Sequence, residues 1–209
     1  MGEETHYNLD GNVTLHRKYS EDGVVFEEGI STYEGNLLLK EVYNCQDEGT
    51  STVTTYEYNQ DGKETRIEVE YAGYSDIQTF NYLEDHEEIR FEDDEGELEK
   101  VQKLWRDDAD RVIKIEVYDH QDLLMETEEI SFNEAGEIQS QKITDHEQGE
   151  WQLQEFEYDA SGNQIATYFS NEAVSKQLML KREYNDKGDM IRSTYPGQQE
   201  VEFHYESED

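Results

Sequence analysis

The chain has 209 residues and a formal net charge of -36, with 53 Asp and Glu against 17 Lys and Arg. This balance argues against duplex nucleic acid and anionic membrane surfaces as ligands, because both are bound through lysine and arginine side chains. Only 33% of the residues are hydrophobic and the mean hydropathy is -1.05, a composition typical of disorder. The 15 tyrosines favour an ordered chain instead, because each can bury a ring while keeping a polar tip.

Segments of alternating polarity recur along the chain. In order they are residues 12–19, 66–71, 112–119 and 201–206 ("NVTLHRKY", "RIEVEY", "VIKIEVYD" and "VEFHYE"). In the second segment, Ile67 and Val69 fall on one face of a strand, and Glu68 and Glu70 fall on the other. The segment "NEAVSKQLML" (171–180) is the best candidate for a helix, although a strand is an equally good interpretation. The alternation predicts half-buried β-strands.

A short motif recurs between these segments: an aromatic residue, then Asn, Asp or Ser, two variable residues, and Gly. Its glycines are Gly11, Gly23, Gly62, Gly136, Gly162 and Gly188. Asn, Asp and Ser favour the first position of a type I turn, and a left-handed Gly at the fourth position closes a hairpin through a bulge. The aromatic residue is expected to pack on the pleated face and to fix the register. Each copy therefore predicts a strand, a tight turn and a strand.

The spacing of the motif indicates a repeat array. Phe132, Tyr158 and Tyr184 follow one another at intervals of 26 residues, and degenerate copies begin at Phe91, Trp105 and Tyr118. Half of this interval is one strand with its connection. We therefore predict an all-β protein, an antiparallel meander of repeated β-hairpins that forms a long twisted or curled sheet or an open barrel-like shell. No linker interrupts the pattern, so residues 1–209 are expected to form a single repeat domain.

The segments "YDASGNQI" (from Tyr158), "YNDKGDMI" (from Tyr184) and "YNLDGNVT" (from Tyr7) resemble YD repeats, the tyrosine–aspartate repeats of bacterial Rhs proteins, insecticidal toxin-complex proteins and teneurins. The resemblance extends from about Tyr7 to about Ile191. It implies a long antiparallel sheet, which in some members of the family encloses a toxin. This chain is too short for a closed shell and often has Asn or Ser in place of the Asp. The resemblance therefore supports the architecture more than an activity.

Catalytic and metal-binding signatures are missing from the sequence. No histidine pair has zinc-ligand spacing, and Cys45 has no second cysteine to join it. The acidic stretch 91–99 lacks the ligand pattern of an EF-hand and is better explained as a solvated hairpin tip. No phosphate-binding loop, dinucleotide fingerprint or nucleophile elbow is present. We expect a protein that is not an enzyme, with no catalytic residue, cofactor or metal site.

The charge predicts a basic protein as the partner, because an acidic surface attracts a cationic one at fast, salt-sensitive rates. Together with the resemblance, this favours a cytoplasmic immunity protein that neutralises a basic toxin domain. Acidic strand faces would supply the field, and their representatives are Glu68, Glu70, Glu200 and Glu202.

Two alternative functions remain open at this stage. One is a structural or cell-surface YD-repeat module that binds carbohydrate or protein, which would be secreted if an N-terminal signal has been removed. The other is a nucleic-acid mimic whose carboxylates occupy a DNA-binding protein. The single cysteine permits a reducing cytoplasm, which is the location that we expect.

Overall fold

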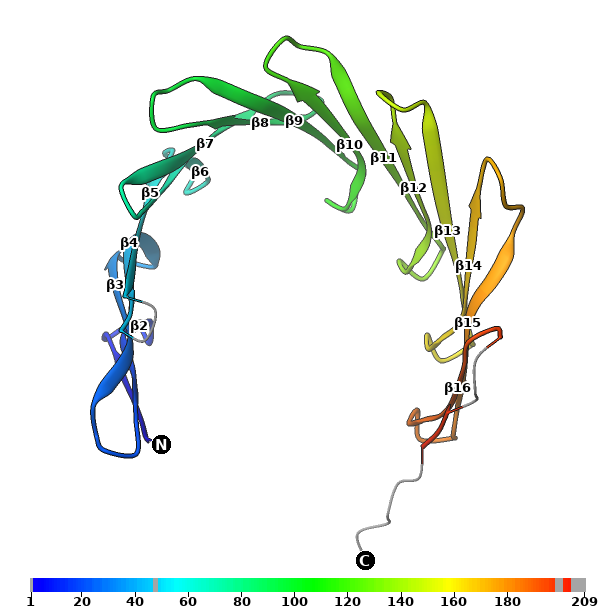
Figure 1. The fold of residues 1–209 in the computed structure, drawn as a ribbon, viewed down its shortest axis with the longest axis horizontal. Helices are drawn as coiled ribbons and strands as arrows, with labels where there is room; N and C mark the ends of the chain where they lie inside the picture. The colour runs from blue at the N-terminus through cyan, green and yellow to red at the C-terminus, as the bar shows by residue number, and fades with distance from the viewer. Residues whose placement is uncertain (1, 47–48, 198–200, 204–209) are drawn as a thin grey trace, which may run out of the picture. The chain divides into compact units, whose positions relative to one another are not determined.

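The computed structural model describes residues 2–46, 49–197 and 201–203. Within them the chain forms 17 β-strands and no helix (Figure 1). The residues group into two compact units, Met1–Gln102 and Lys103–Asp209, and that residues 1–209 form a single repeat domain stays a prediction.

The first unit is a run of hairpins. Its strands are β1 (Gly2–Tyr7), β2 (Val13–Tyr19), β3 (Val25–Glu34), β4 (Leu37–Cys45), β5 (Thr50–Tyr58), β6 (Glu64–Tyr71), β7 (Tyr74–Tyr82) and β8 (Glu87–Glu92), followed by β9 (Leu98–Arg106), which contains the unit boundary. From β1 to β8, each strand pairs antiparallel with the next one in sequence.

The second unit continues the same pattern. Its strands are β10 (Val112–Asp119), β11 (Leu124–Phe132), β12 (Ile138–Asp145), β13 (Glu150–Tyr158), β14 (Gln164–Asn171), β15 (Gln177–Tyr184), β16 (Met190–Thr194) and β17 (Val201–Glu202), again paired in sequence order. The segment 171–180 is not a helix. It joins the end of β14 to the start of β15, where Leu178 and Leu180 are half-buried and Gln177 and Met179 are exposed, an alternation of period two.

Each unit is a single layer of sheet. Among the described residues, the strands within a unit contact only their sequence neighbours. Val101 and Ala166 are the only apolar residues of this part of the chain that are buried. Side chains pack against cross-strand neighbours rather than against a second layer, so stability is close to a sum of nearest-neighbour terms. The predicted all-β antiparallel meander is confirmed within each unit.

The recurring motif forms one type of turn. In the turn 159–163, the N–H of Gly162 donates to the carbonyl of Asp159 at 3.1 Å, and the N–H of Asp159 donates to the carbonyl of Asn163 at 3.0 Å. The Asp159 carboxylate also accepts the N–H groups of Ser161 and Asn163 at 2.8 and 2.9 Å. The register shifts by a bulge between Glu157 and Tyr158, just before the turn. The same backbone bonds close the turns 8–12, 20–24, 59–63, 93–97, 107–111, 119–123, 133–137 and 185–189.

The six glycines of the motif occupy the fourth position of these turns, with φ between 77° and 89°. Two further turns have an aspartate there: Asp110 and Asp122 both adopt φ of 63°. Asp tolerates the left-handed region better than most residues, because its short polar side chain bonds locally. The degenerate copies at Trp105 and Tyr118 are therefore complete turns, and the polar first residue was the signal that could identify them.

The tyrosine of the motif does more than pack. The hydroxyl of Tyr158 donates to the carbonyl of Ile138 at 2.8 Å, and that of Tyr184 donates to the carbonyl of Gln164 at 3.1 Å. In the first unit, Tyr58 reaches the carbonyl of Leu38 in the same way at 2.8 Å. Each bond joins the strand that enters one turn to the strand that leaves the preceding turn on the same edge. The hydroxyl therefore links successive hairpins, which explains why the motif favours tyrosine over other aromatic residues.

Candidate functional site

Most of the lysine and arginine side chains already have a carboxylate or an aromatic ring as a partner within the chain. On β2, the Nε of Arg17 lies 2.6 Å from Glu28, and the Nζ of Lys18 lies 2.6 Å from Glu27. Cations lie over aromatic rings at Lys63, Lys100, Lys103, Arg111, Lys114 and Lys176. Because these cations are already engaged, the excess carboxylates dominate the charge that a partner would meet.

Glu68 and Glu70 are two of the four glutamates that the sequence predicts to face a basic partner. They share one face of β6. Glu68 lies opposite Thr55 and Ile77, and its carboxylate is 2.7 Å from Arg66. Glu70 is exposed and lies opposite Val53. Glu68 is thus partly neutralised by its own strand. Glu200 lies outside the described residues, and the side chain of Glu202, the last residue of β17, does too.

A stronger concentration of charge lies in the second unit. Glu126 of β11 stands directly opposite Asp145 of β12, which stands directly opposite Glu150 of β13. Residues paired in this way project from the same face with Cβ atoms about 5 Å apart. We call these three residues the carboxylate row. Within the described part of the chain, none of them forms an ion pair with a lysine or arginine, although like charges directly opposite one another destabilise a sheet.

The carboxylate row lines a pocket of about 260 Å³. Trp151 and Glu172 also line it, and the Glu172 carboxylate accepts the backbone N–H of Trp151 at 2.6 Å. A fourth carboxylate therefore adjoins the row, whereas the side chain of Trp151, next to Glu150 on β13, projects from the other face of the sheet. This combination suits an organic cation, because the carboxylates supply charge and Ile143, which also lines the pocket on this face, supplies apolar contact. No three His, Cys, Asp or Glu side chains among the described residues are placed to hold a metal ion.

Cys45 lines a separate pocket of about 510 Å³ in the first unit, together with Arg17 and Glu28. The thiol is free and the residue is half-buried. Arg17 is already paired with Glu28, so the pocket presents no unpaired charged group at this position. Cys45 is therefore best explained as an ordinary small residue at the end of β4.

Three aspartates at the first position of a turn, Asp107, Asp119 and Asp159, have depressed pKa values. The backbone N–H groups of Leu123 and Gln121 donate to the Asp119 carboxylate at 2.9 and 2.8 Å and lower its pKa. The Asn163 side chain lowers the pKa of Asp159, and the Arg111 side chain lowers that of Asp107. Each bond favours the charged form of the carboxylate, so each turn depends on that form.

Asp119→Asn is expected to lose less stability in acid than the parent protein does. The pKa of folded Asp119 lies below the unfolded value of about 3.9, so its stabilisation is present above that pH and is lost as the pH falls through the folded pKa. Asparagine keeps the acceptor, as Asn133 does in its own turn, but it does not become protonated. Thermal midpoints should fall less steeply for the variant below about pH 4.

Both proteins lose the repulsion among their other carboxylates over the same pH range, so that contribution cancels in the comparison. Superimposable acid limbs for Asp119→Asn and the parent protein would contradict the role given to the turn carboxylate.

Within the described residues, no element is a helix with the length and hydrophobicity needed to cross a bilayer. No protein-family model matches the sequence, and no curated protein matches it.

Similar solved structures include a porin-like protein from Bacteroides vulgatus ATCC 8482, with 11% identity and a TM-score of 0.42 over 88% of this chain and 97% of that chain. They also include TcdB2-TccC3-Cdc42, with 16% identity and a TM-score of 0.31, and TcdB2-TccC3 without its hypervariable C-terminal region, with 17% and 0.30. In each of the latter two matches, 94% of this chain covers 13% of the other. Identities and scores this low give no basis for assigning a function to the chain.

Proposed function

We propose that the protein is a non-enzymatic acidic binding protein for a basic partner, and specifically a cytoplasmic immunity protein that neutralises a basic toxin domain. The observation that carries the proposal is the carboxylate row. Glu126, Asp145 and Glu150 stand side by side in register, with no lysine or arginine paired to them in the described chain. The unbound sheet bears the cost of this repulsion, and a cationic partner would relieve it.

The surroundings of the row resemble the centre of a protein interface. Rim charges by themselves contribute little affinity, and most binding energy comes from a few aromatic or arginine anchors. An arginine of the partner would be such an anchor, paired with the row and in contact with Ile143, which lines the same pocket. The excess of carboxylates over the whole chain would then accelerate the encounter with a cationic domain.

The test is retention of a basic protein from the native cell on immobilised full-length protein, followed by binding measurements at low and high salt. Retention at low salt and release at high salt are expected. The double variant Asp145→Asn/Glu150→Gln should weaken binding by about tenfold or more, while Glu95→Gln/Asp186→Asn, which removes the same charge from exposed turns, should change it by less than about twofold.

Retention of no basic protein, or an affinity that does not depend on salt, would refute the proposal. Displacement of the retained protein by DNA would identify a DNA-binding partner and favour the nucleic-acid mimic. A toxin-like reading frame beside the gene would support the immunity role.

A second candidate function rests on a different observation. Tyr43, Thr52, Tyr71 and Tyr74 stand opposite one another across β4 to β7, and the three tyrosines are 41% to 64% exposed. Exposed rings in a row can stack on sugars. The protein would then be a surface module built of YD-type repeats that binds carbohydrate. Binding to a glycan array that is lost in Tyr71→Ala/Tyr74→Ala would support this candidate, and an array without binding would count against it.

A further inference from the structure

In two repeats, a cationic side chain at the end of a turn lies over an aromatic ring of the next hairpin. Arg111, the last residue of the turn 107–111, has its guanidinium carbon 4.3 Å from the centre of the Phe132 ring. Lys63, the last residue of the turn 59–63, has its Nζ 4.5 Å from the centre of the Tyr82 ring. The two contacts lie in different units. At Phe132 and Tyr82, the ring that precedes a turn therefore accepts a cation from the turn before it on the same edge.

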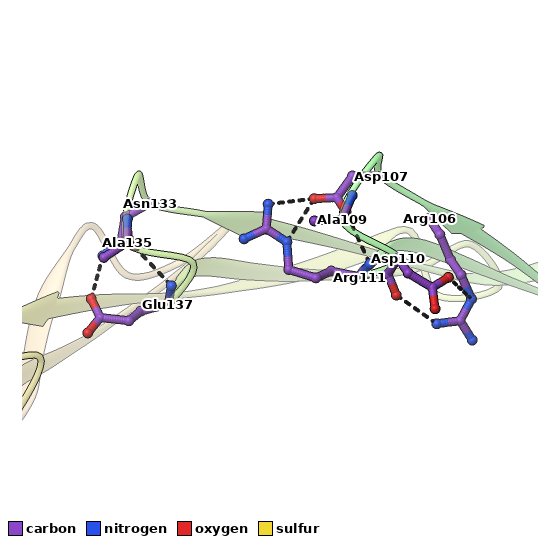
Figure 2. Close-up of polar contacts among 8 residues, drawn as sticks. All are labelled: Arg106, Asp107, Ala109, Asp110, Arg111, Asn133, Ala135 and Glu137. Carbon is purple, nitrogen blue, oxygen red and sulfur yellow. Dashed lines mark hydrogen bonds and ion pairs between the residues drawn. The ribbon is translucent and has the colours of Figure 1, made fainter.

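Arg111 is held in this position by its own turn. Its Nε and Nη2 donate to the Asp107 carboxylate at 2.8 and 2.6 Å, as Figure 2 shows. Its Nη1 lies 3.3 Å from the position that a Cβ on Gly136 would take. The guanidinium thus lies between the Asp107 carboxylate and the Phe132 ring, beside Gly136 of the next turn on the same edge.

Glu137 occupies the same position one repeat later, and Figure 2 shows it in the turn beside that of Arg111. It lies 21 residues before Tyr158, as Arg111 lies 21 residues before Phe132. Its Oε1 is 2.7 Å from the position of a Cβ on Gly162. At this repeat a carboxylate replaces the cation beside the ring, and it accepts a bond from Asn133 Nδ2 at 2.6 Å.

A pocket of about 630 Å³ opens at this place, lined by Glu137, Tyr158, Phe156, Glu134 and Asp159 among others. The bond of the Tyr158 hydroxyl to Ile138 fixes the orientation of the ring. Within the described chain, no lysine or arginine forms an ion pair with Glu137. Burial, followed by the neighbouring Glu137 charge, raises the pKa of Tyr158.

We propose that this Tyr158 pocket binds an arginine or lysine side chain of a protein partner, stacked on the Tyr158 ring and paired with Glu137. The ligand reproduces from outside the contact that Arg111 and Lys63 make from within. A guanidinium or an ammonium desolvated between a ring and a carboxylate gains both cation–π and charge-assisted hydrogen-bond energy. The identity of the partner as a basic protein rests on the proposed function, but the cation site itself does not.

The test is an NMR titration of the full-length chain with N-acetyl-arginine methylamide and N-acetyl-lysine methylamide, with the uncharged citrulline analogue as a control. We expect weak binding, with a Kd of about 1–10 mM, and the largest amide shifts at residues 135–139 and 158–161. The citrulline analogue should produce no comparable shifts. Binding of only one of the two cations would also support the proposal and would show which head group the pocket prefers.

Matched variants separate the site from general charge. Glu137→Gln keeps the acceptor for Asn133 and should weaken binding by about fivefold or more. Glu137→Arg should abolish it, because the new side chain takes the place that Arg111 has in its own repeat. Tyr158→Phe keeps the ring but loses the bond that fixes its orientation, so it should weaken binding less than Glu137→Gln does. Glu129→Gln, on the other face of the sheet, should not change the titration.

Equal shifts with citrulline, no shifts with either cation, or equal binding by folded Glu137→Gln would each overturn the Tyr158 pocket. A basic cellular protein retained equally by the parent and by Glu137→Gln would also overturn it as a partner site while leaving the proposed function standing. If the cations bind in the pocket but the chain retains no basic protein, the proposed function is refuted and the Tyr158 pocket stands.

Discussion

Gly162→Val is expected to lower the free energy of unfolding by about 2–3 kcal/mol. Gly162 has a φ of +84°, a conformation that a β-branched residue adopts only with strain. A Cβ at this position would also lie 2.7 Å from Glu137 Oε1, so the Glu137 side chain would have to move and release Asn133. Urea denaturation followed by circular dichroism measures the loss, and the slope of the transition checks that it remains two-state.

Two other glycines separate the causes of this loss. Gly188 has a φ of +85° but no neighbour closer than 3.9 Å, so Gly188→Val should show the backbone strain alone, about 1–2 kcal/mol. Gly29 lies within β3 without a positive φ and with no atom within 4 Å, so Gly29→Val should cost nothing and can stabilise the strand. Equal losses at Gly29 and Gly162 would show that left-handed backbone does not govern these turns.

Asn59→Ala is expected to cost about 1–2 kcal/mol, similar to the loss of a helix cap. Asn59 Oδ1 accepts the backbone N–H groups of Asp61 and Lys63, both at 3.0 Å, and so satisfies two donors in the turn between β5 and β6. Alanine leaves both to solvent and removes the preference of the chain for this turn. The thermal midpoint and the urea midpoint should fall together.

The chain itself supplies the control for this variant. Aspartate fills the same position in the turns 93–97, 107–111, 119–123 and 159–163, so Asn59→Asp should retain most of the stability. Asn12→Ala, at the last residue of the turn 8–12, removes only side-chain contacts of 3.4 to 3.5 Å and should cost less than about 0.5 kcal/mol. If Asn59→Asp is as unstable as Asn59→Ala, the side-chain acceptor is not what holds the turn.

Local chemistry determined the architecture, and for that reason it could be predicted from the sequence. The alternation of Ile67 and Val69 with Glu68 and Glu70 assigns the two faces of β6 without knowledge of its neighbours. A polar residue followed three positions later by Gly specifies a turn through bonds within five residues. Such preferences act within one hairpin and need no tertiary contact.

Only the tertiary structure decided which charges meet, because strand register brings together residues that are far apart in sequence. Glu126 and Asp145 are 19 residues apart, and their pairing depends on the length of a hairpin and on the position of its bulge. The same holds for Glu137, whose relation to Tyr158 is set by one full repeat. In a chain with 53 carboxylates, the sequence predicts an acidic surface, but register selects the few that stand together unpaired.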